Sequence, residues 1–475
     1  MKNSSYICIS NLENMRRIQL FLSFVLLSVS IWAQDNYVFP EDVKPLILTR
    51  WGQNYPFNLL CPKTTNENGE NTNMKAGCGS VAMAQIINYH QYPAMSPDKA
   101  YEYNWDLMYP TVTIGLRREE IVAVAKLISD CGVSSLTDYG EKTSQTSISK
   151  MMGALKRLFS YSNYMAIYER SQFTTSLQDS LYRQLIFNEL KARRPVLYRA
   201  YSEKEKGGHL FIIDGCRGRK VHVNMGWAGD RDGYYDLDDL SGYSQQQWLL
   251  VGVADTTYKA ETKEMILTEP GTLKTILDSH ELLTTQHIKL SGKMDRSDFS
   301  TLRQMLKTGL LRTIDMEQVD LEQLPDSAFF ECTYLSHFVA PRTMQNTGQW
   351  SFCGCRNLNR IVFHEGLRAI GNASFMGCSN LLRVELPSTT TQIGHNAFTS
   401  CSTLLSVTLP EGIQKVGHYA FSYCNHLYSI KLPKTLRSIG KEVFKSCERL
   451  THVHLDKENP YFVVDEHNEL KAIAQ

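Results

Sequence analysis

The chain has 475 residues, of which 43% are hydrophobic and 21% are charged, which is the composition of an ordinary globular protein. This length exceeds that of one typical domain, so two or three domains are expected. Because 50 basic residues are balanced by 49 acidic ones, the net charge is only +1, and nucleic acid and membrane surfaces are excluded as partners.

Residues 1–33 have the pattern of a secretory signal peptide. Arg16 and Arg17 precede the apolar run 20–29, and Ala33 offers a small residue for cleavage. Met15 is a second candidate for the start. The apolar run is shorter than the ~20 residues that a transmembrane helix needs, so no membrane span is expected. The mature chain is therefore expected to be secreted or held at the cell surface.

Residues 34–256 are predicted to form one domain in which helices precede strands. A turn-rich stretch, 40–60, leads to a helix that starts at Cys78. Further helices are predicted at 117–131, 147–159 and 175–194. Short strands separated by turns are predicted at 196–201, 209–214, 220–224, 234–237 and 249–254. This order is typical of an α+β domain with an antiparallel sheet.

Cys78 is the first candidate for a reactive residue, because it lies at the predicted start of a helix that ends before Pro93. The peptide dipoles and free N–H groups at a helix N-terminus favour an anion, so we expect the pKa of the thiol to fall. The alternative is a buried structural cysteine, since free cysteine is among the most buried residue types.

A nucleophilic thiol needs a base and a group that orients the base. His209 is the leading base, because it follows two glycines where a loop enters a buried strand. Asn224 is the candidate to orient the imidazole, and Trp227 is the candidate to shield it from water. The oxyanion would be stabilised by the backbone N–H of Cys78 and by the side-chain amide of Gln53.

Two other histidines are rival bases. His90 lies about 18 Å from Cys78 along the helix axis, which is too far for direct contact. His222 lies in the middle of a predicted strand, where a structural role is expected.

The residues around these candidates resemble the streptopain-like cysteine peptidases, secreted bacterial enzymes with a papain-like fold. Four stretches together carry the resemblance: 53–60, 77–86, 89–93 and 208–224. The resemblance implies that Cys78 is the nucleophile, His209 the general base and Gln53 the oxyanion donor. It also implies that Gly208 lies along the bound peptide and that Ser144 matches a serine that contacts substrate.

This sequence departs from the family pattern at two places. Met225 replaces a tryptophan that packs near the catalytic histidine in the family, so His209 is expected to be held less firmly and activity to be lower. The peptidase region also begins almost directly after Ala33, where the family's zymogens carry a prosegment. Latency, if any, is therefore expected from a separate inhibitor protein or from another element.

The last part of the chain, 326–475, repeats with a period of 23 residues. The repeated phenylalanines are Phe329, Phe352, Phe375, Phe398, Phe421 and Phe444, and a cysteine follows each of them three residues later. A fixed period of this length predicts a leucine-rich repeat solenoid, in which each coil buries its apolar edge against its neighbours. Residues 257–325 are expected to form a linker and an N-terminal cap.

The repeat resembles bacterial surface leucine-rich repeats, which implies binding to a host or surface protein; a passive spacer is the alternative. One cysteine per coil gives no tetrahedral set, so buried free thiols are favoured over metal ligands or disulfides. No metal or cofactor is expected. The pairing of Cys61, Cys131 and Cys216 stays open.

Three functions compete. The first is a secreted cysteine endopeptidase that acts on proteins or peptides and is positioned by its repeats. The second is a binding or adhesion protein whose peptidase fold is weak or inactive. The third is a transpeptidase or deamidase that uses the same Cys–His pair.

Overall fold

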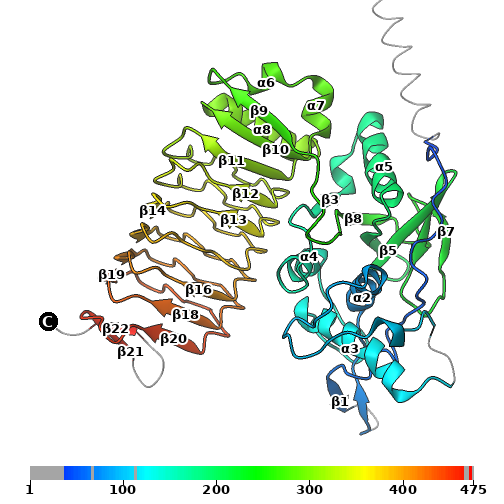
Figure 1. Cartoon of the computed structure of the whole chain (residues 1–475). Helices are drawn as coiled ribbons and strands as arrows, with labels where there is room; N and C mark the ends of the chain where they lie inside the picture. Colours follow the sequence, from blue (N-terminus) through cyan, green and yellow to red (C-terminus); the bar gives the residue numbers. More distant parts are fainter. Residues whose placement is uncertain (1–36, 66–68, 112–114, 465–469, 473–475) are drawn as a thin grey trace, which may run out of the picture.

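The computed structural model describes residues 37–65, 69–111, 115–464 and 470–472, which form two parts lying side by side (Figure 1). The predicted signal peptide lies outside the described residues. In the described part of the chain, no helix is both long and apolar enough to cross a membrane.

A six-stranded antiparallel sheet forms the centre of the first part. Its strand order is β3-β8-β4-β5-β6-β7. The strands are β3 (Ala166–Glu169), β4 (Val196–Ser202), β5 (Gly207–Arg217), β6 (Lys220–Asn224), β7 (Gly233–Asp236) and β8 (Gln245–Val251). The sequence pattern does not predict β3, and β8 begins four residues before the predicted start at residue 249. The antiparallel α+β architecture is confirmed.

Helices cover both faces of this sheet. They are α2 (Cys78–His90), α3 (Arg118–Ser134), α4 (Ile148–Arg157) and α5 (Ser176–Lys191). Side chains alternate along β5, so Leu210 and Ile212 pack against α2, α3 and α4, whereas Phe211 and Ile213 pack in the core that contains α5. The smaller elements are β1 (Lys63–Thr65), β2 (Asn71–Asn73), η1 (Trp105–Leu107) and η2 (Arg170–Gln172).

The second part is a solenoid of parallel strands. A five-stranded sheet contains β9 (Lys263–Leu267), β10 (His287–Gly292), β11 (Thr313–Val319), β12 (His337–Val339) and β13 (Arg360–Val362). The helices beside it are α6 (Leu273–Ile276), α7 (Ser279–Thr284) and α8 (Arg296–Thr308). The strands of the stretch expected as linker and cap thus already belong to the sheet of the first repeats.

The remaining coils keep the 23-residue register. One sheet contains β14 (Ala369–Ile370), β15 (Gln392–Ile393), β17 (Lys415–Val416) and β19 (Ser438–Ile439), and another contains β16 (Ser406–Thr408), β18 (Ser429–Leu432) and β20 (His452–Leu455). Each strand pairs with residues 23 positions further on, as in Gln392 with Lys415. The antiparallel hairpin of β21 (Phe462–Val464) and β22 (Leu470–Ala472) follows the last coil.

Two columns of side chains, the phenylalanines and the cysteines that repeat every 23 residues, fill the solenoid interior and are called ladders below. The rings of Phe375 and Phe398 are stacked with their centroids 5.3 Å apart, and this stacking repeats from coil to coil. Five of the six repeat cysteines, from Cys355 to Cys447, donate their S–H to a phenylalanine carbonyl of the preceding coil, as Cys378 does to Phe352 at 3.1 Å. All cysteines of the described residues are free thiols, and the repeat cysteines Cys332 to Cys424 are buried.

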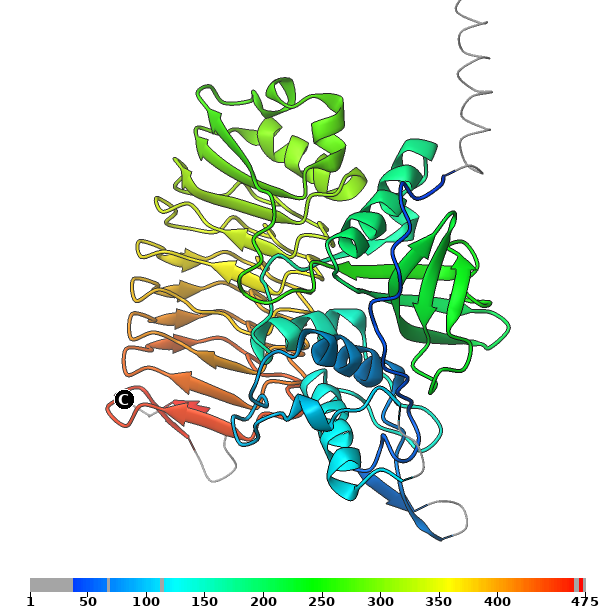
Figure 2. The ribbon, with the colours of Figure 1, turned by 45° about the vertical axis from the view of Figure 1, so that its right-hand side comes forward.

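The two parts meet along α4 and β3 (Figure 2). The side chain of Ser149 on α4 donates to Asn357 of a repeat coil at 3.2 Å. The buried guanidinium of Arg312 donates through Nε to the carbonyl of Ile167 on β3 at 3.0 Å and lies between the rings of Tyr168 and Tyr334. The parts therefore share a packed interface.

Candidate active site

Cys78 is the first residue of α2, and glycines on both sides of it make this position accessible to close neighbours. Gly77 has φ 88°, a conformation that side chains other than glycine rarely adopt. A methyl group at Gly79 would lie 2.5 Å from Thr146 Cγ2. The half-buried thiol accepts a hydrogen bond from the backbone N–H of Leu210 at 3.4 Å. The residue that follows His209 therefore touches the sulfur.

The electrostatics of the thiol differ from the expectation for a helix N-terminus. Burial raises the pKa of Cys78, although backbone N–H groups, chiefly that of Leu210, and the charge of Arg199 act in the opposite direction. Burial outweighs the helix terminus here because the half-buried sulfur packs against the start of β5, where it contacts the backbone of Leu210.

His209 lies near the start of β5 and is 5% exposed. Its Nε2 lies 2.8 Å from the carbonyl oxygen of Met225, and because a carbonyl can only accept, the ring must donate from Nε2. The neutral imidazole then carries its proton on Nε2 and leaves Nδ1 able to accept one. Burial lowers the pKa of His209 to about 4, with a smaller opposing effect of the bond to Met225.

Asn224 does not fill the position that the sequence suggested. Its Oδ1 accepts from Gln85 Nε2 at 3.0 Å and from the backbone N–H of Gly226 at 3.1 Å, and its Nδ2 donates to the carbonyl of Thr49 at 2.8 Å. These bonds direct the amide toward α2, so the Met225 carbonyl replaces it as the partner of the imidazole. Asn224 still fixes that carbonyl, because Gly226 N–H belongs to the same peptide unit.

Gln85 is a site residue that the sequence analysis missed. It is fully buried on α2, seven residues after Cys78, and its Oε1 accepts from Thr49 Oγ1 at 2.9 Å. A buried glutamine on an otherwise apolar helix face was the available signal, since buried polar groups need partners. Gln85 links the helix that carries the thiol to the peptide that orients His209.

Met225, which stands where the family has a tryptophan, does not contact the imidazole through its side chain in the way that Trp227 does. The Met225 side chain is fully buried in the core beneath the sheet. Trp227 instead covers the imidazole, with its ring centroid 4.5 Å from that of His209. Tyr243 lies on the ring as well, at 5.4 Å. The imidazole is therefore enclosed by aromatic rings despite the substitution.

The remaining predicted residues gather around one cleft of about 740 Å³. Its lining includes Gln53, Cys78, Ser144, Gly208, His209 and Trp227. Ser144 Oγ donates to the carbonyl of Lys75 at 2.6 Å and accepts from Gly140 N–H at 3.0 Å, so this hydroxyl joins its own loop to the segment that precedes α2. Gly208 lies next to the guanidinium of Arg199, which also lines the cleft.

The rival bases lie elsewhere. His90 Nδ1 bonds to Tyr161 OH at 3.0 Å, and His222 Nδ1 bonds to the buried carboxylate of Asp214 at 2.6 Å. Neither lines the cleft. Among the described residues, no group of three or more His, Cys, Asp or Glu side chains is arranged to hold a metal ion.

Comparison with known proteins gives separate matches for the two parts. Residues 51–235 match the Peptidase C10 family, and 304–404 and 351–463 match the BspA type leucine rich repeat region, in six copies. Streptopain of Streptococcus pyogenes is 32% identical over 220 residues, which cover 40% of this chain and 54% of that protein. The chain thus spans about half the length of the curated streptopains that it matches.

Solved structures match each part as well. Interpain A, a cysteine protease of Prevotella intermedia, is 29% identical, with a TM-score of 0.40 over 46% of this chain and 96% of that one. A leucine rich repeat protein of T. pallidum is 29% identical, with a TM-score of 0.30 over 31% of this chain and 71% of that one.

Proposed function

We propose that this chain, which carries a peptidase C10 domain followed by a BspA-type leucine-rich repeat region, is a cysteine endopeptidase. The observation that supports this most is the convergence of Cys78 and His209 on one cleft. The backbone bond from Leu210 to the sulfur brings the start of β5 to the start of α2, and the imidazole has its acceptor nitrogen, Nδ1, available.

In the acylation step, the thiol of Cys78 transfers its proton to His209 Nδ1 as the sulfur attacks the peptide carbonyl. The backbone N–H of Cys78 and the side chain of Gln53 stabilise the oxyanion that forms. The tetrahedral intermediate collapses when His209 returns the proton to the leaving amine. The new C–S bond gives a thioester, and the C–N bond of the substrate is broken.

In the deacylation step, His209 removes a proton from water, and the resulting hydroxide attacks the thioester. The sulfur leaves and is reprotonated, which releases the new carboxyl end of the substrate. Gly208 lies beside the bound peptide, where the absence of a side chain leaves room for its backbone. Trp227 excludes water from the bond between His209 and Met225, and Ser144 shapes the opposite wall through its loop.

The substrates are proteins or peptides, and the chain is exported and acts outside the cell. The predicted signal peptide supports export. The repeat region binds a protein at a surface and thereby holds the peptidase near its substrates. The shared interface along α4 and β3 supports this role, because it fixes the direction in which the cleft faces relative to the repeats.

Hydrolysis of casein by residues 34–475 tests the proposal. The wild type should release peptides under reducing conditions, and Cys78→Ala should not, with both proteins showing the same thermal unfolding. Peptide masses that correspond to cleaved chains without ligation or deamidation would separate hydrolysis from the transpeptidase and deamidase alternatives. Intact casein with a well-folded wild type would contradict the proposal.

One observation favours the second candidate, a binding protein with a weak peptidase. Burial raises the pKa of Cys78 and lowers that of His209, so the resting pair is uncharged at neutral pH. An uncharged pair is less reactive than a thiolate–imidazolium pair. Surface retention of the chain with no difference in casein turnover between the wild type and Cys78→Ala would support this candidate.

A further inference from the structure

A cavity of about 340 Å³ that is open to solvent lies at the interface between the two parts, and its volume is within the size range of small-ligand sites. It is bounded by the C-terminal half of α4 on one side and by the coils around β13 on the other. Its charged lining residues are Lys156, Arg157, Arg360, Arg383 and Glu385. Four basic side chains and one carboxylate therefore line a space between the two parts.

The carboxylate of Glu385 already forms an ion pair. Glu385 pairs with Arg383 on its own coil at 3.2 Å. In the described part of the chain, no carboxylate pairs with Lys156, Arg157 or Arg360. Lys156 Nζ donates to the carbonyl of Met165 at 3.0 Å, a neutral acceptor that leaves its charge uncompensated.

The positive charges of these side chains are destabilised in this position. The Nε of Arg157 is buried and has no hydrogen-bond partner. Burial, with the charge of Arg360, lowers the pKa of Lys156 to about 7. Burial is also the main cause that lowers the pKa of neighbouring His337 to about 3, and the charges of Lys156 and Arg360 add to it. A bound anion would relieve this excess of positive charge.

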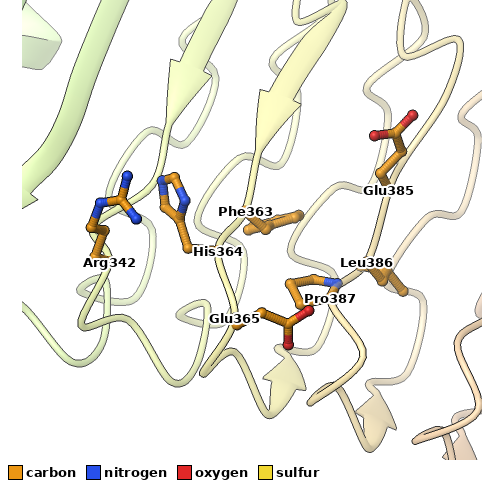
Figure 3. Close-up of a pocket in the computed structure, with 7 residues that line it drawn as sticks. All are labelled: Arg342, Phe363, His364, Glu365, Glu385, Leu386 and Pro387. Atoms are coloured by element: carbon orange, nitrogen blue, oxygen red, sulfur yellow. The ribbon is translucent and has the colours of Figure 1, made fainter.

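An adjacent hollow on the repeat surface differs from the interface cavity in its ion pairing. Figure 3 shows this hollow, with Arg342 and His364 on neighbouring coils and Phe363 and Glu385 on the side that it shares with the interface cavity. There the cation is neutralised, because Arg342 pairs with Glu317.

We propose that the interface cavity binds a small multivalent oxyanion, which pairs with Lys156, Arg157 and Arg360 and so joins the peptidase part to the repeat part. Planar guanidinium groups and an ammonium group are the donors that recognise phosphate and carboxylate oxygens. The site is distinct from the substrate cleft and does not depend on peptidase activity.

Isothermal titration of the full chain carrying Cys78→Ala tests the site, with inorganic pyrophosphate and citrate as probes at constant ionic strength. We expect one equivalent to bind. Lys156→Met and Arg360→Gln should each weaken the affinity about tenfold, the effect of losing one charge-assisted contact. Arg356→Gln is the matched control, because this exposed arginine precedes Arg360 by four residues and lines a different hollow, so it should bind as tightly as the parent.

Proton uptake provides a second measurement. Because Lys156 titrates near neutral pH when the cavity is empty, a bound anion should raise its pKa, and binding at pH 7.5 should take up less than one proton. Titrations with citrate, which is almost fully ionised at this pH, in buffers of different ionisation enthalpy measure this uptake, which Lys156→Met should abolish. No binding at millimolar pyrophosphate or citrate, equal affinity in all four proteins, or uptake that persists in Lys156→Met would overturn the proposal. Tighter binding of one probe would identify the oxyanion as a phosphate or a polycarboxylate.

Discussion

At the scale of single residues, the site depends on how burial sets the charge of two groups. The thiol of Cys78 and the imidazole of His209 are both shifted toward their neutral forms, by the same desolvation. The orientation of the imidazole is nevertheless well defined, because the Met225 carbonyl accepts its Nε2 proton and Trp227 and Tyr243 enclose its ring. Reactivity is therefore expected to depend on alignment more than on a preformed ion pair.

The pH dependence of activity should reflect His209. Its pKa in the folded protein is about 4, below its ordinary value of 6.5, so the neutral base persists above pH 4. We expect kcat/KM for a peptide without titratable groups to fall as the pH drops through about 4. An acidic limb near 6.5 would show instead that the imidazole is solvated.

The same shift predicts a dependence of stability on pH. Between pH 6.5 and 4 the unfolded chain binds a proton at this residue and the folded chain does not, so stability decreases as the pH falls through this window. The free energy of unfolding should lose up to about 3 kcal/mol here in the wild type relative to His209→Gln. Denaturant unfolding of both proteins at pH 7 and pH 4.5 measures the difference. An equal loss of unfolding free energy in the two proteins would contradict the lowered pKa of His209.

At the scale of elements, buried amides join the helix of the nucleophile to the strand of the base. Gln85 on α2 contacts Asn224 at the end of β6, and Asn224 contacts the peptide unit of Met225 and Gly226. Each bond in this series is buried, so its loss leaves an unpaired polar group. The series explains how α2 and β5 keep their relative positions.

Replacing Asn224 should impair catalysis through His209. Asn224→Ala is expected to reduce stability by about 1–3 kcal/mol and to reduce kcat with little change in KM, because Asn224 is a positioning residue that does not line the cleft. Steady-state kinetics on a peptide substrate measures both constants. Asn58→Ala is the control, since Asn58 is also a buried asparagine with bonds to two backbone carbonyls, and it should lose stability but keep kcat.

Each cysteine of the ladder should stabilise its own coil, by an amount that depends on how deeply the thiol is buried. Cys378→Ala removes a buried side chain and the S–H bond to Phe352, and we expect a loss of about 1–3 kcal/mol. Cys447→Ala, at the half-buried end of the ladder, should lose less. Urea unfolding of the three proteins tests this, and equal losses would mean that position along the ladder has no effect.

At the scale of the whole molecule, the two parts behave as one packed unit because polar groups are shared across their interface. Arg312 makes several of these contacts: it is fully buried, bonds to Ile167 and Gln172, and stacks against Tyr168 and Tyr334. Helix α4 is held between the start of α2 and the repeats, since Gly79 faces Met151 and Gly153 faces Leu382. The repeats thus pack against the helix that follows the cleft-lining stretch 142–146.

Arg312→Met should loosen this arrangement. The variant keeps the stem of the side chain but leaves the carbonyl of Ile167 buried without its donor, so we expect a loss of about 2–4 kcal/mol and faster proteolysis at residues 255–262. Limited proteolysis with mass spectrometry measures the second effect. Arg303→Met is the control, because Arg303 bonds to a carbonyl within the repeat part, and its loss should leave 255–262 protected.

Local sequence patterns predicted most of the helices, the repeat coils and the two central site residues. Periodicity located the helices and the 23-residue coils, and the contexts of Cys78 and His209 indicated a peptidase, because these signals are local in sequence. The features that the sequence analysis missed depend on contacts between residues far apart in the chain. Asn224 turns toward Gln85, 139 residues away, and the backbone carbonyl of Met225 takes its expected place beside the imidazole of His209. The Arg312 contacts and the cation-lined cavity arise only when the two parts are packed together.

Labelling of Cys78 by an epoxysuccinyl inhibitor tests the central claim most directly. The reagent is applied to folded residues 34–475 under reducing conditions, and mass spectrometry locates the label among all the free thiols. We predict one label, on Cys78, in the wild type and almost none in His209→Ala, because the imidazole activates only that sulfur. Equal labelling of the two proteins, or label on other cysteines with Cys78 unmodified, would contradict the account.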